Sequence, residues 1–413
     1  MAVPSSKSAT NRALLCAALT ETPIEIVHPL ESEDTAALRR CLTAMGASIE
    51  STAEGFSVSG PLQGDPAREI VLDAGDSGTA ARFLTAAAAA VPGRFLVTGS
   101  PRLCERPIGE LVGALASAGA RIDYRGQRGR LPVSVEGGAL RSGAITVDAS
   151  QSSQFLSAIL LAGVAVEGGL SVRASGPVAS APYVRMTLET LREFGHEALE
   201  GEFVRVARGK RIRSRFQTPG DYSAAIPLLA CAGAVGGDVT LTGLRWPSGD
   251  ADAGALTVLE SMGVRIEASA SQVRAAGNRD DLRPVSVCAA DFPDAVPALA
   301  ALAALAPGQS RFTGIAHLRL KESDRIAALA RLLSLAGATA VAEEDSLTVT
   351  GPARPGDGVL RLPTFRDHRM AMTAAILSLR LPGILIEDPG CVAKSYPRFF
   401  RDLETIVVRD GRS

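Results

Sequence analysis

The sequence predicts an α/β protein of two domains, each built from three repeated units that combine two helices with short strands. The length of 413 residues suggests two domains, because it exceeds what one hydrophobic core usually supports. Two helix patterns, one amphipathic and one apolar on every side, alternate along the whole chain. Six such units divide into three per domain, and the short polar loops favour compact domains over a solenoid. We expect one domain over residues 5–220 and the other over residues 221–413 together with residues 1–4.

The amphipathic pattern is a helix with leucines at helical spacing that ends in glycine and leads into a short β-like run. Glycine suits the left-handed backbone position just past a helix end. The terminating glycines are Gly46, Gly119, Gly195, Gly263 and Gly337. In chain order the copies cover residues 36–50, 108–123, 184–199, 254–268 and 326–341, with a shortened sixth copy at 396–408.

The second pattern is rich in alanine and has no polar face, which is typical of a helix buried on all sides. Each unit is therefore predicted to contain one buried and one outer helix. In chain order the copies of the buried helix cover residues 11–19, 79–91, 153–166, 223–235, 295–306 and 370–379.

Composition excludes several classes of protein. The net charge of −1 gives no basic excess that would favour binding to nucleic acid or to an anionic membrane. The longest apolar run, residues 295–307, is shorter than the roughly 18 residues that span a bilayer. Six widely spaced cysteines and four scattered histidines predict neither a disulfide framework nor a metal site. Because the N-terminus has no signal pattern, we expect a cytoplasmic protein whose cysteines are small buried hydrophobic residues.

A polar cluster stands just ahead of each apolar helix or in its first turn. Helix N-termini present unpaired N–H groups and the positive end of the helix dipole, so they attract anions. Ser, Thr and Asp are also ordinary N-cap residues, but capping does not account for Lys7, Arg12, Gln154, His368 or Arg369. Six helix starts that converged on one space between two domains would form a cleft for a multiply anionic ligand. The clusters cover residues 5–12, 75–80, 150–154, 220–223, 291–294 and 365–369.

Lysine is rare, since only four of the 43 basic residues are lysines. Lys7, Lys321 and Lys394 stand among hydroxyls, carboxylates and arginines, where a compact ammonium can hold a phosphate or release a proton as arginine cannot. Glu322 and Arg325 stand three residues apart. Taken alone, that spacing favours a surface ion pair of small energetic weight.

Seven motifs resemble, in this order, the enolpyruvyl transferase family, and in particular its shikimate branch. The resemblance covers essentially the whole chain and implies two inside-out α/β domains with the active site in the interdomain cleft. It further implies transfer of the enolpyruvyl group of phosphoenolpyruvate to the 5-hydroxyl of shikimate 3-phosphate, with release of phosphate and without a metal or organic cofactor. The motifs are PSSKSATNRALL, DSGTAARFL, ERPIGELV, SQSSQFLSA, LKESDRI, DHRMAM and AKSYPRFF.

The resemblance also implies a set of ligand-binding residues, in which arginine forks suit bidentate contacts to carboxylate and phosphate. Those expected to hold shikimate 3-phosphate are Lys7, Ser8, Arg12, Ser152, Ser153, Gln154, Ser180, Tyr183, Asp294 and Lys321. Those expected to hold phosphoenolpyruvate are Lys7, Gly78, Thr79, Arg106, Gln154, Arg325, Arg369 and Lys394.

The implied chemistry needs a base for the 5-hydroxyl and an acid that protonates the methylene carbon of phosphoenolpyruvate. Asp294 is the expected base and Glu322 the expected acid, with Lys7 and His368 assisting proton transfer or stabilising the leaving phosphate. The division of the proton transfers among these four residues stays open. A carboxyl group that acts as an acid at neutral pH needs a raised pKa, which burial could supply.

Three alternatives remain. The sister branch that acts on UDP-N-acetylglucosamine uses a loop cysteine five residues before an arginine, but here Pro101 stands five residues before Arg106. A non-catalytic anion-binding homologue would need the arginines but no acid and base. A transferase for a related cyclic acid is separated from the shikimate branch only by Arg12, Ser152, Ser153 and Ser180, which suit a phosphorylated acceptor.

The sequence departs from the family's pattern at the start of the chain, at Ser5, at Phe83 and in the segment RWPSGDAD, and two of these departures bear on the expectations above. Family members usually carry further residues ahead of the first motif that form a strand, so either the chain is a shortened form or its second domain has one strand fewer. Phe83 replaces a usual proline on the helix behind Gly78, which leaves open how strongly glyphosate, the family's competitive inhibitor, binds. We expect glyphosate to inhibit this protein and the protein to be a monomer.

Overall fold

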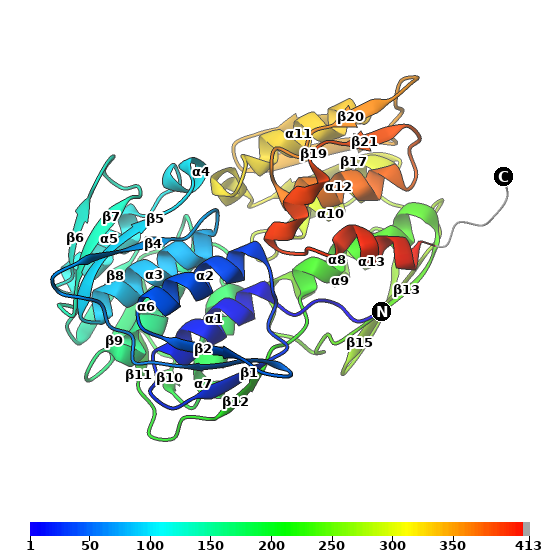
Figure 1. Ribbon diagram of the computed structural model, residues 1–413. Coiled ribbons are helices and arrows are strands. Elements are labelled where there is room, and N and C mark those ends of the chain that lie inside the picture. The colour runs from blue at the N-terminus through cyan, green and yellow to red at the C-terminus, as the bar shows by residue number, and fades with distance from the viewer. Residues whose placement is uncertain (408–413) are drawn as a thin grey trace. The chain divides into compact units, whose positions relative to one another are not determined.

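The computed structural model describes residues 1–407 (Figure 1). Contacts between residues divide the chain into two compact units. The N-terminal unit is Ser5–Thr218, and the C-terminal unit consists of Met1–Pro4 and the residues from Pro219 onward. The end of the shortened sixth helix pattern, Val408, lies outside the described residues.

The N-terminal unit contains three four-stranded sheets. The sheet β12-β1-β3-β2 is formed by β1 (Ile24–Val27), β2 (Ser48–Ser51), β3 (Gly55–Ser59) and β12 (Arg215–Gln217). The sheet β4-β5-β7-β6 is formed by β4 (Glu69–Asp73), β5 (Gly93–Thr98), β6 (Arg121–Tyr124) and β7 (Val133–Gly137). The sheet β10-β11-β9-β8 is formed by β8 (Gly143–Val147), β9 (Leu170–Ala174), β10 (Glu197–Leu199) and β11 (Val204–Ala207).

The C-terminal unit also has three sheets, two of which are smaller. The sheet β13-β15-β14 is formed by β13 (Gly237–Thr242), β14 (Arg265–Ser269) and β15 (Gln272–Gly277). The sheet β16-β17-β19-β18 is formed by β16 (Ser286–Cys288), β17 (Gly308–Thr313), β18 (Thr339–Ala342) and β19 (Ser346–Gly351). The last sheet pairs β20 (Leu360–Leu362) with β21 (Ile384–Ile386).

The four-stranded sheets share one topology. One edge strand runs parallel to its neighbour, and the other two pairings are antiparallel. In the first sheet the parallel edge strand is β12, which comes from the far end of the unit. Residues 1–3 take the equivalent place beside β13, where the Val3 N–H donates to the Thr242 carbonyl at 3.0 Å. This pairing is a single parallel bridge, Ala2 to Thr242.

The alanine-rich helices form the core of each unit, as the lack of a polar face predicts. In the N-terminal unit α1 (Lys7–Ala18), α3 (Gly78–Ala90) and α6 (Ser153–Ala162) contact one another. In the C-terminal unit the corresponding contacts join α8 (Tyr222–Val235), α10 (Val296–Leu305) and α12 (His368–Ser378). Each triplet is almost completely buried, so the helices lie inside and the sheets outside.

The other helices are partly exposed and follow the amphipathic pattern. The five predicted terminal glycines all have a left-handed backbone with φ of 89° to 96°, which confirms their role as helix ends. These helices are α2 (Glu33–Ala44), α5 (Gly109–Ser117), α7 (Pro182–Glu193), α9 (Ala255–Ser261), α11 (Arg325–Leu335) and α13 (Phe399–Ile406). The short helical turns are α4 (Pro101–Cys104), η1 (Gly163–Ala165), η2 (Ala251–Gly254), η3 (Ala316–Leu320) and η4 (Pro389–Lys394).

No helix within residues 1–407 has the length and apolar character needed to cross a membrane. The expectation that the cysteines are buried is wrong for half of them: Cys16, Cys41 and Cys231 are buried, whereas Cys288 is exposed and the other two are half-buried. Cys288 ends a short edge strand, and an edge strand leaves side chains in solvent.

Candidate functional site

Helix N-termini carry the predicted residues of the N-terminal unit. Ser6, Ser77 and Ser152 cap α1, α3 and α6, each accepting a hydrogen bond from a backbone N–H of the first turn. Six of the predicted residues lie directly after these caps, near the positive end of the helix dipole: Lys7, Ser8, Gly78, Thr79, Ser153 and Gln154. Ordinary capping therefore explains where these three helices begin, but it does not explain the charged residues that follow the caps.

Lys7, the first residue of α1, is held by a carboxylate of the next helix. Its Nζ lies 3.1 Å from Oδ2 of Asp34, which is buried in the first turn of α2. Ser8 follows in the same turn of α1, and its carbonyl accepts a hydrogen bond from Arg12 Nη1 at 2.9 Å. One turn of α1 thus presents an ammonium and a hydroxyl from a fixed backbone.

The start of α3 lies against Arg106. A Cβ atom added to Gly78 would stand 2.6 Å from Arg106 Nη1, so only glycine lets the guanidinium lie across this turn. Arg106 is almost fully buried. Beside it, Gln154 Nε2 on α6 donates to Thr79 Oγ1 at 3.0 Å, which joins the first turns of α3 and α6.

Arg12 joins α1, α6 and α7. Its Nε donates to Thr187 Oγ1 at 2.8 Å, and its Nη2 donates to the Tyr183 carbonyl at 3.0 Å. Ser153 lies buried in the first turn of α6. Ser180, just ahead of α7, is buried and has a φ of 54°, a left-handed backbone that costs a non-glycine residue about 1 kcal/mol. Strained buried residues of this kind cluster at functional sites.

Arg325 is the centre of the predicted residues in the C-terminal unit. Its guanidinium donates to Asp367 at 2.8 Å, to Asp294 at 2.8 Å and to Glu322 at 2.9 Å. The Arg325 side chain is only 1% exposed. The expectation of a surface ion pair between Glu322 and Arg325 is therefore wrong, because Arg325 is buried and Glu322 is half-buried. Glu322 also precedes the helix that Arg325 begins.

Asp294 is surrounded by positive charge. Lys321 Nζ lies 3.4 Å and Arg369 Nη2 lies 3.9 Å from its carboxylate oxygens, in addition to Arg325. Burial raises the pKa of Asp294, but Lys321, Arg325 and Arg369 outweigh burial and hold that pKa well below its usual range. Asp294 is therefore a carboxylate in this arrangement.

Asp294 also explains an exception among the helix starts. Five of the six buried helices follow a Ser or Asp cap, whereas the N-cap residue of α10 is Ala295, which has no side chain that could cap it. The neighbouring carboxylate, Asp294, is turned toward Lys321 and Arg325 instead. A carboxylate that could cap a helix is here held by cations, which separates it from the ordinary capping residues.

The remaining predicted residues lie around this cluster. His368 and Arg369 occupy the first turn of α12 and are buried, with His368 Nδ1 3.7 Å from Asp367 Oδ1. Arg369 Nη2 donates to Ser223 Oγ at 2.6 Å. Lys394 ends η4, and its Nζ lies 3.9 Å from Glu322 Oε1. The C-terminal unit thus gathers a connected group of charged and titratable side chains: Asp294, Lys321, Glu322, Arg325, His368, Arg369 and Lys394.

Comparison with known proteins identifies the family of this chain. The family model described as EPSP synthase (3-phosphoshikimate 1-carboxyvinyltransferase) matches residues 1–403. The chain belongs to the EPSP synthase family.

Relatives and solved structures of the EPSP synthase family match over nearly the whole chain. A 3-phosphoshikimate 1-carboxyvinyltransferase of Methanoculleus marisnigri is 40% identical over 404 residues, which cover 97% of this chain and 94% of that protein. The enzyme of the same name from Thermococcus kodakarensis is 40% identical over 406 residues, covering 98% and 96%. A solved EPSP synthase structure from Acinetobacter baumannii superposes with a TM-score of 0.77 at 30% identity, covering 98% of this chain and 94% of that chain.

Sequence reasoning gave no role to several residues that contact the family's motifs. Asp367 caps α12 and binds Arg325, and Asp34 binds Lys7. Asp367 belongs to the predicted polar cluster at residues 365–369. A capping role was enough to account for it there, so its bond with Arg325 was not predicted. Asp34 looks in the sequence like an ordinary acidic residue of a helix first turn, so only the packing of α1 against α2 identifies it.

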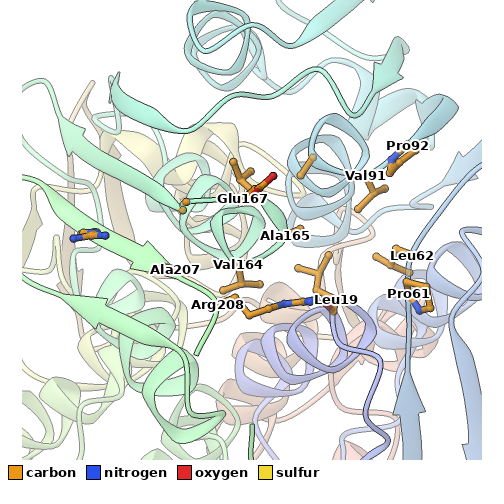
Figure 2. A pocket seen from close by; sticks show the side chains of 15 residues that line it. Leu19, Pro61, Leu62, Val91, Pro92, Val164, Ala165, Glu167, Ala207 and Arg208 are labelled. Carbon is orange, nitrogen blue, oxygen red and sulfur yellow. Dashed lines mark hydrogen bonds between the residues drawn. The ribbon is translucent and has the colours of Figure 1, made fainter. Parts of the chain in front are cut away.

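One cavity of the N-terminal unit lies away from the EPSP synthase motif residues. This cavity of about 550 Å³ lies where α1, α3 and α6 end, lined by Leu19, Val91 and Val164 among others (Figure 2). The Arg208 side chain at its edge donates to the Leu19 carbonyl at 2.7 Å. This is the opposite end of the helices from the predicted residues. The cavity faces helix C-termini, which repel anions, so it is not the candidate site.

Proposed function

We propose that this protein transfers the enolpyruvyl group of phosphoenolpyruvate to the 5-hydroxyl of shikimate 3-phosphate and releases phosphate. Membership of the EPSP synthase family supports the reaction. The observation that carries the chemistry is the cluster in which two carboxylates, Asp294 and Glu322, share the buried Arg325. A site that only bound anions would gain nothing from two carboxylates among its cations, because both would repel the ligand.

We assign shikimate 3-phosphate to the hydroxyls and cations of α1, α6 and α7 and to the pair Asp294 and Lys321. We assign phosphoenolpyruvate to the start of α3 and to Lys7, Arg106, Gln154, Arg325, Arg369 and Lys394. Helix N-termini and arginine forks support these assignments, because both bind phosphate and carboxylate.

In the proposed reaction the 5-hydroxyl oxygen attacks C2 of phosphoenolpyruvate and its proton passes to Asp294. Glu322 donates a proton to the methylene carbon, which gives a tetrahedral intermediate. The bond from C2 to the phosphate oxygen then breaks and one methyl proton returns to a base, so the vinyl group is restored. Lys7 and His368 assist by stabilising the phosphate that leaves.

The substrates themselves would activate Asp294. With its carboxylate held by Lys321, Arg325 and Arg369, Asp294 has too low a pKa to accept a proton readily. The phosphate and carboxylate of the substrates compete for these same cations. Binding therefore weakens the hold on Asp294 and raises its pKa toward the range of a useful base. The same displacement frees Glu322 from Arg325 and Lys394.

Three further assignments belong to this proposal. Glyphosate would compete for the phosphoenolpyruvate residues, and Phe83 would not prevent this, because α3 runs unbroken from Gly78 to Ala90 around it. The protein would act in the cytoplasm, since free cysteines suit a reducing compartment. It would act as a monomer, because one chain supplies every residue assigned here.

Phosphate release tests the proposal. Purified protein should release phosphate from phosphoenolpyruvate when shikimate 3-phosphate is present. It should release none with UDP-N-acetylglucosamine or unphosphorylated shikimate as the acceptor. Absence of release with shikimate 3-phosphate would overturn the proposal, and equal release with unphosphorylated shikimate would overturn the choice of a phosphorylated acceptor.

A further inference from the structure

The buried guanidinium of Arg12 is fixed by two hydroxyls from other helices. Thr187 Oγ1 on α7 accepts from Arg12 Nε at 2.8 Å, and Ser157 Oγ on α6 lies 3.4 Å from Arg12 Nη2. The two hydroxyls are 2.9 Å apart and bonded to each other. Thr187 and Ser157 are completely buried, so neither is a residue that a substrate could be expected to touch.

These two hydroxyls lie one helical turn behind residues assigned to shikimate 3-phosphate. Thr187 follows Tyr183 by four residues on α7, and Ser157 follows Ser153 by four residues on α6. Residues four apart lie on one face of a helix. Arg12 in turn binds the carbonyl of Ser8 on α1 at 2.9 Å. One guanidinium therefore links α1, α6 and α7 within the N-terminal unit.

The aromatic ring of Phe83 extends this link to α3. The Arg12 guanidinium carbon lies 5.5 Å from the centre of the Phe83 ring, within the range of a cation–π contact. All four helices that carry assigned residues in this unit thus contact one side chain. A side chain with so many partners has a single orientation.

We infer that Thr187 and Ser157 are positioning residues, which orient Arg12 and through it the shikimate 3-phosphate side of the site. The inference rests on the proposed function. Removing the Thr187 hydroxyl leaves the Arg12 Nε–H buried without its acceptor, a loss that the guanidinium can relieve only by moving. Binding of shikimate 3-phosphate should weaken. Binding of phosphoenolpyruvate should not, because most of its assigned residues lie on α3, at Arg106 and in the C-terminal unit.

The chain offers a matched control on the same helix. Thr190 is also buried in α7, but its hydroxyl donates to the Met186 carbonyl of its own helix at 2.8 Å. Thr190→Val therefore removes a buried hydroxyl from α7 and leaves Arg12 untouched. Thr187→Val removes the hydroxyl that Arg12 uses, and Thr187→Ser keeps it.

The test is steady-state kinetics of phosphate release with each substrate varied, together with calorimetric binding of shikimate 3-phosphate. Thr187→Val should raise KM and Kd for shikimate 3-phosphate roughly tenfold, the effect of one lost hydrogen bond to a charged group. KM for phosphoenolpyruvate should change by less than about twofold. Thr187→Ser should restore the wild-type values, and Thr190→Val should match them.

A second arm uses Ser157→Ala and the double variant. Because both hydroxyls act through Arg12, the double variant should be no more than about twofold worse than Thr187→Val. The inference is overturned if Thr187→Val, still folded by thermal unfolding, binds shikimate 3-phosphate like wild type. It is also overturned if both KM values rise equally or Thr187→Ser fails to restore binding. If the wild-type protein itself releases no phosphate with shikimate 3-phosphate, the proposed function fails instead.

Discussion

Lys7 and Asp34 form an ion pair across α1 and α2, with 3.1 Å between Nζ and Oδ2. Asp34 is 4% exposed, so the pair is shielded from solvent and salt far more than a surface pair. Asp34→Asn should lower kcat/KM roughly tenfold or more, because the ammonium loses the charge that holds it at the start of α1. Steady-state kinetics measures this. Glu33→Gln, an exposed neighbour in the same turn of α2, is the control, and an equal loss in both variants would contradict the assignment.

Glu322→Gln tests the proposed acid. Glutamine keeps a partner for Arg325 but has no proton to give, so both substrates should still bind while kcat falls at least roughly a hundredfold. Kinetics and calorimetric binding together separate the two effects. Glu343→Gln, which removes a carboxylate from an exposed ion pair with Arg311, should be neutral. Full activity of Glu322→Gln would remove Glu322 from the acid role.

Gly78→Ala should weaken binding of phosphoenolpyruvate. The new Cβ would stand 2.6 Å from Arg106 Nη1, so the guanidinium must swing away while the helix itself stays intact. We expect KM for phosphoenolpyruvate to rise about tenfold and the thermal unfolding midpoint to stay nearly unchanged. Gly113→Ala on α5, where a Cβ meets no atom within 4 Å, should leave kinetics unchanged. An unchanged KM in Gly78→Ala would separate Arg106 from this substrate.

Substrate binding should raise the pKa of Asp294, which predicts proton uptake. At about pH 5, forming the complex with shikimate 3-phosphate and inorganic phosphate should take up more protons in the wild type than in Asp294→Asn. Calorimetry in buffers of different ionisation enthalpy measures the difference and needs no turnover. Asp291→Asn, an exposed neighbour, is the control. Equal uptake in wild type and Asp294→Asn would show that the carboxylate stays ionised throughout.

His196 should make the protein less stable in acid. Burial, and then the charge of Arg208, lower the pKa of His196 to about 4, and its Nδ1 accepts a hydrogen bond from the Gly209 N–H at 3.3 Å. The neutral ring is the stable form, so its contribution is complete above the unfolded pKa of roughly 6.5 and is lost as pH falls toward 4.

His196→Asn keeps an acceptor but cannot titrate. Its free energy of unfolding, measured with urea, should therefore fall less steeply between pH 6.5 and pH 4 than that of the wild type, by up to roughly 3 kcal/mol over the interval. His28→Asn is the control, because His28 is exposed. Parallel pH profiles of wild type and His196→Asn would contradict the prediction.

Periodicity alone predicted the buried helices and the glycines that end the outer ones, because both follow from the chain's local preference. Periodicity did not predict which segments pair at the edges of the sheets. The pairing of β1 with β12 joins residues about 190 positions apart, such as Glu25 and Arg215, and no local pattern encodes such a contact. The short bridge of Ala2 to Thr242 has the same origin.

For the site, residue type identified the charges but not their partners. Lys321, Arg325 and Lys394 stood out by their surroundings in the sequence, yet the burial of Arg325 and its bond to Asp367 depend on how α11 packs against α12. Thr187 and Ser157 gave no signal at all, since a threonine and a serine inside helices are common. Their role becomes visible only when three helices meet at Arg12.

The late position of β12 has a consequence for synthesis. The sheet that packs against α1 gains its edge strand only after Gln217 has left the ribosome. The helix α1 carries Lys7, Ser8 and Arg12. Until then β1 presents an unpaired edge, which is a site for wrong pairing with other chains. A nascent chain stalled before residue 215 should therefore depend on chaperones more than one released just beyond it.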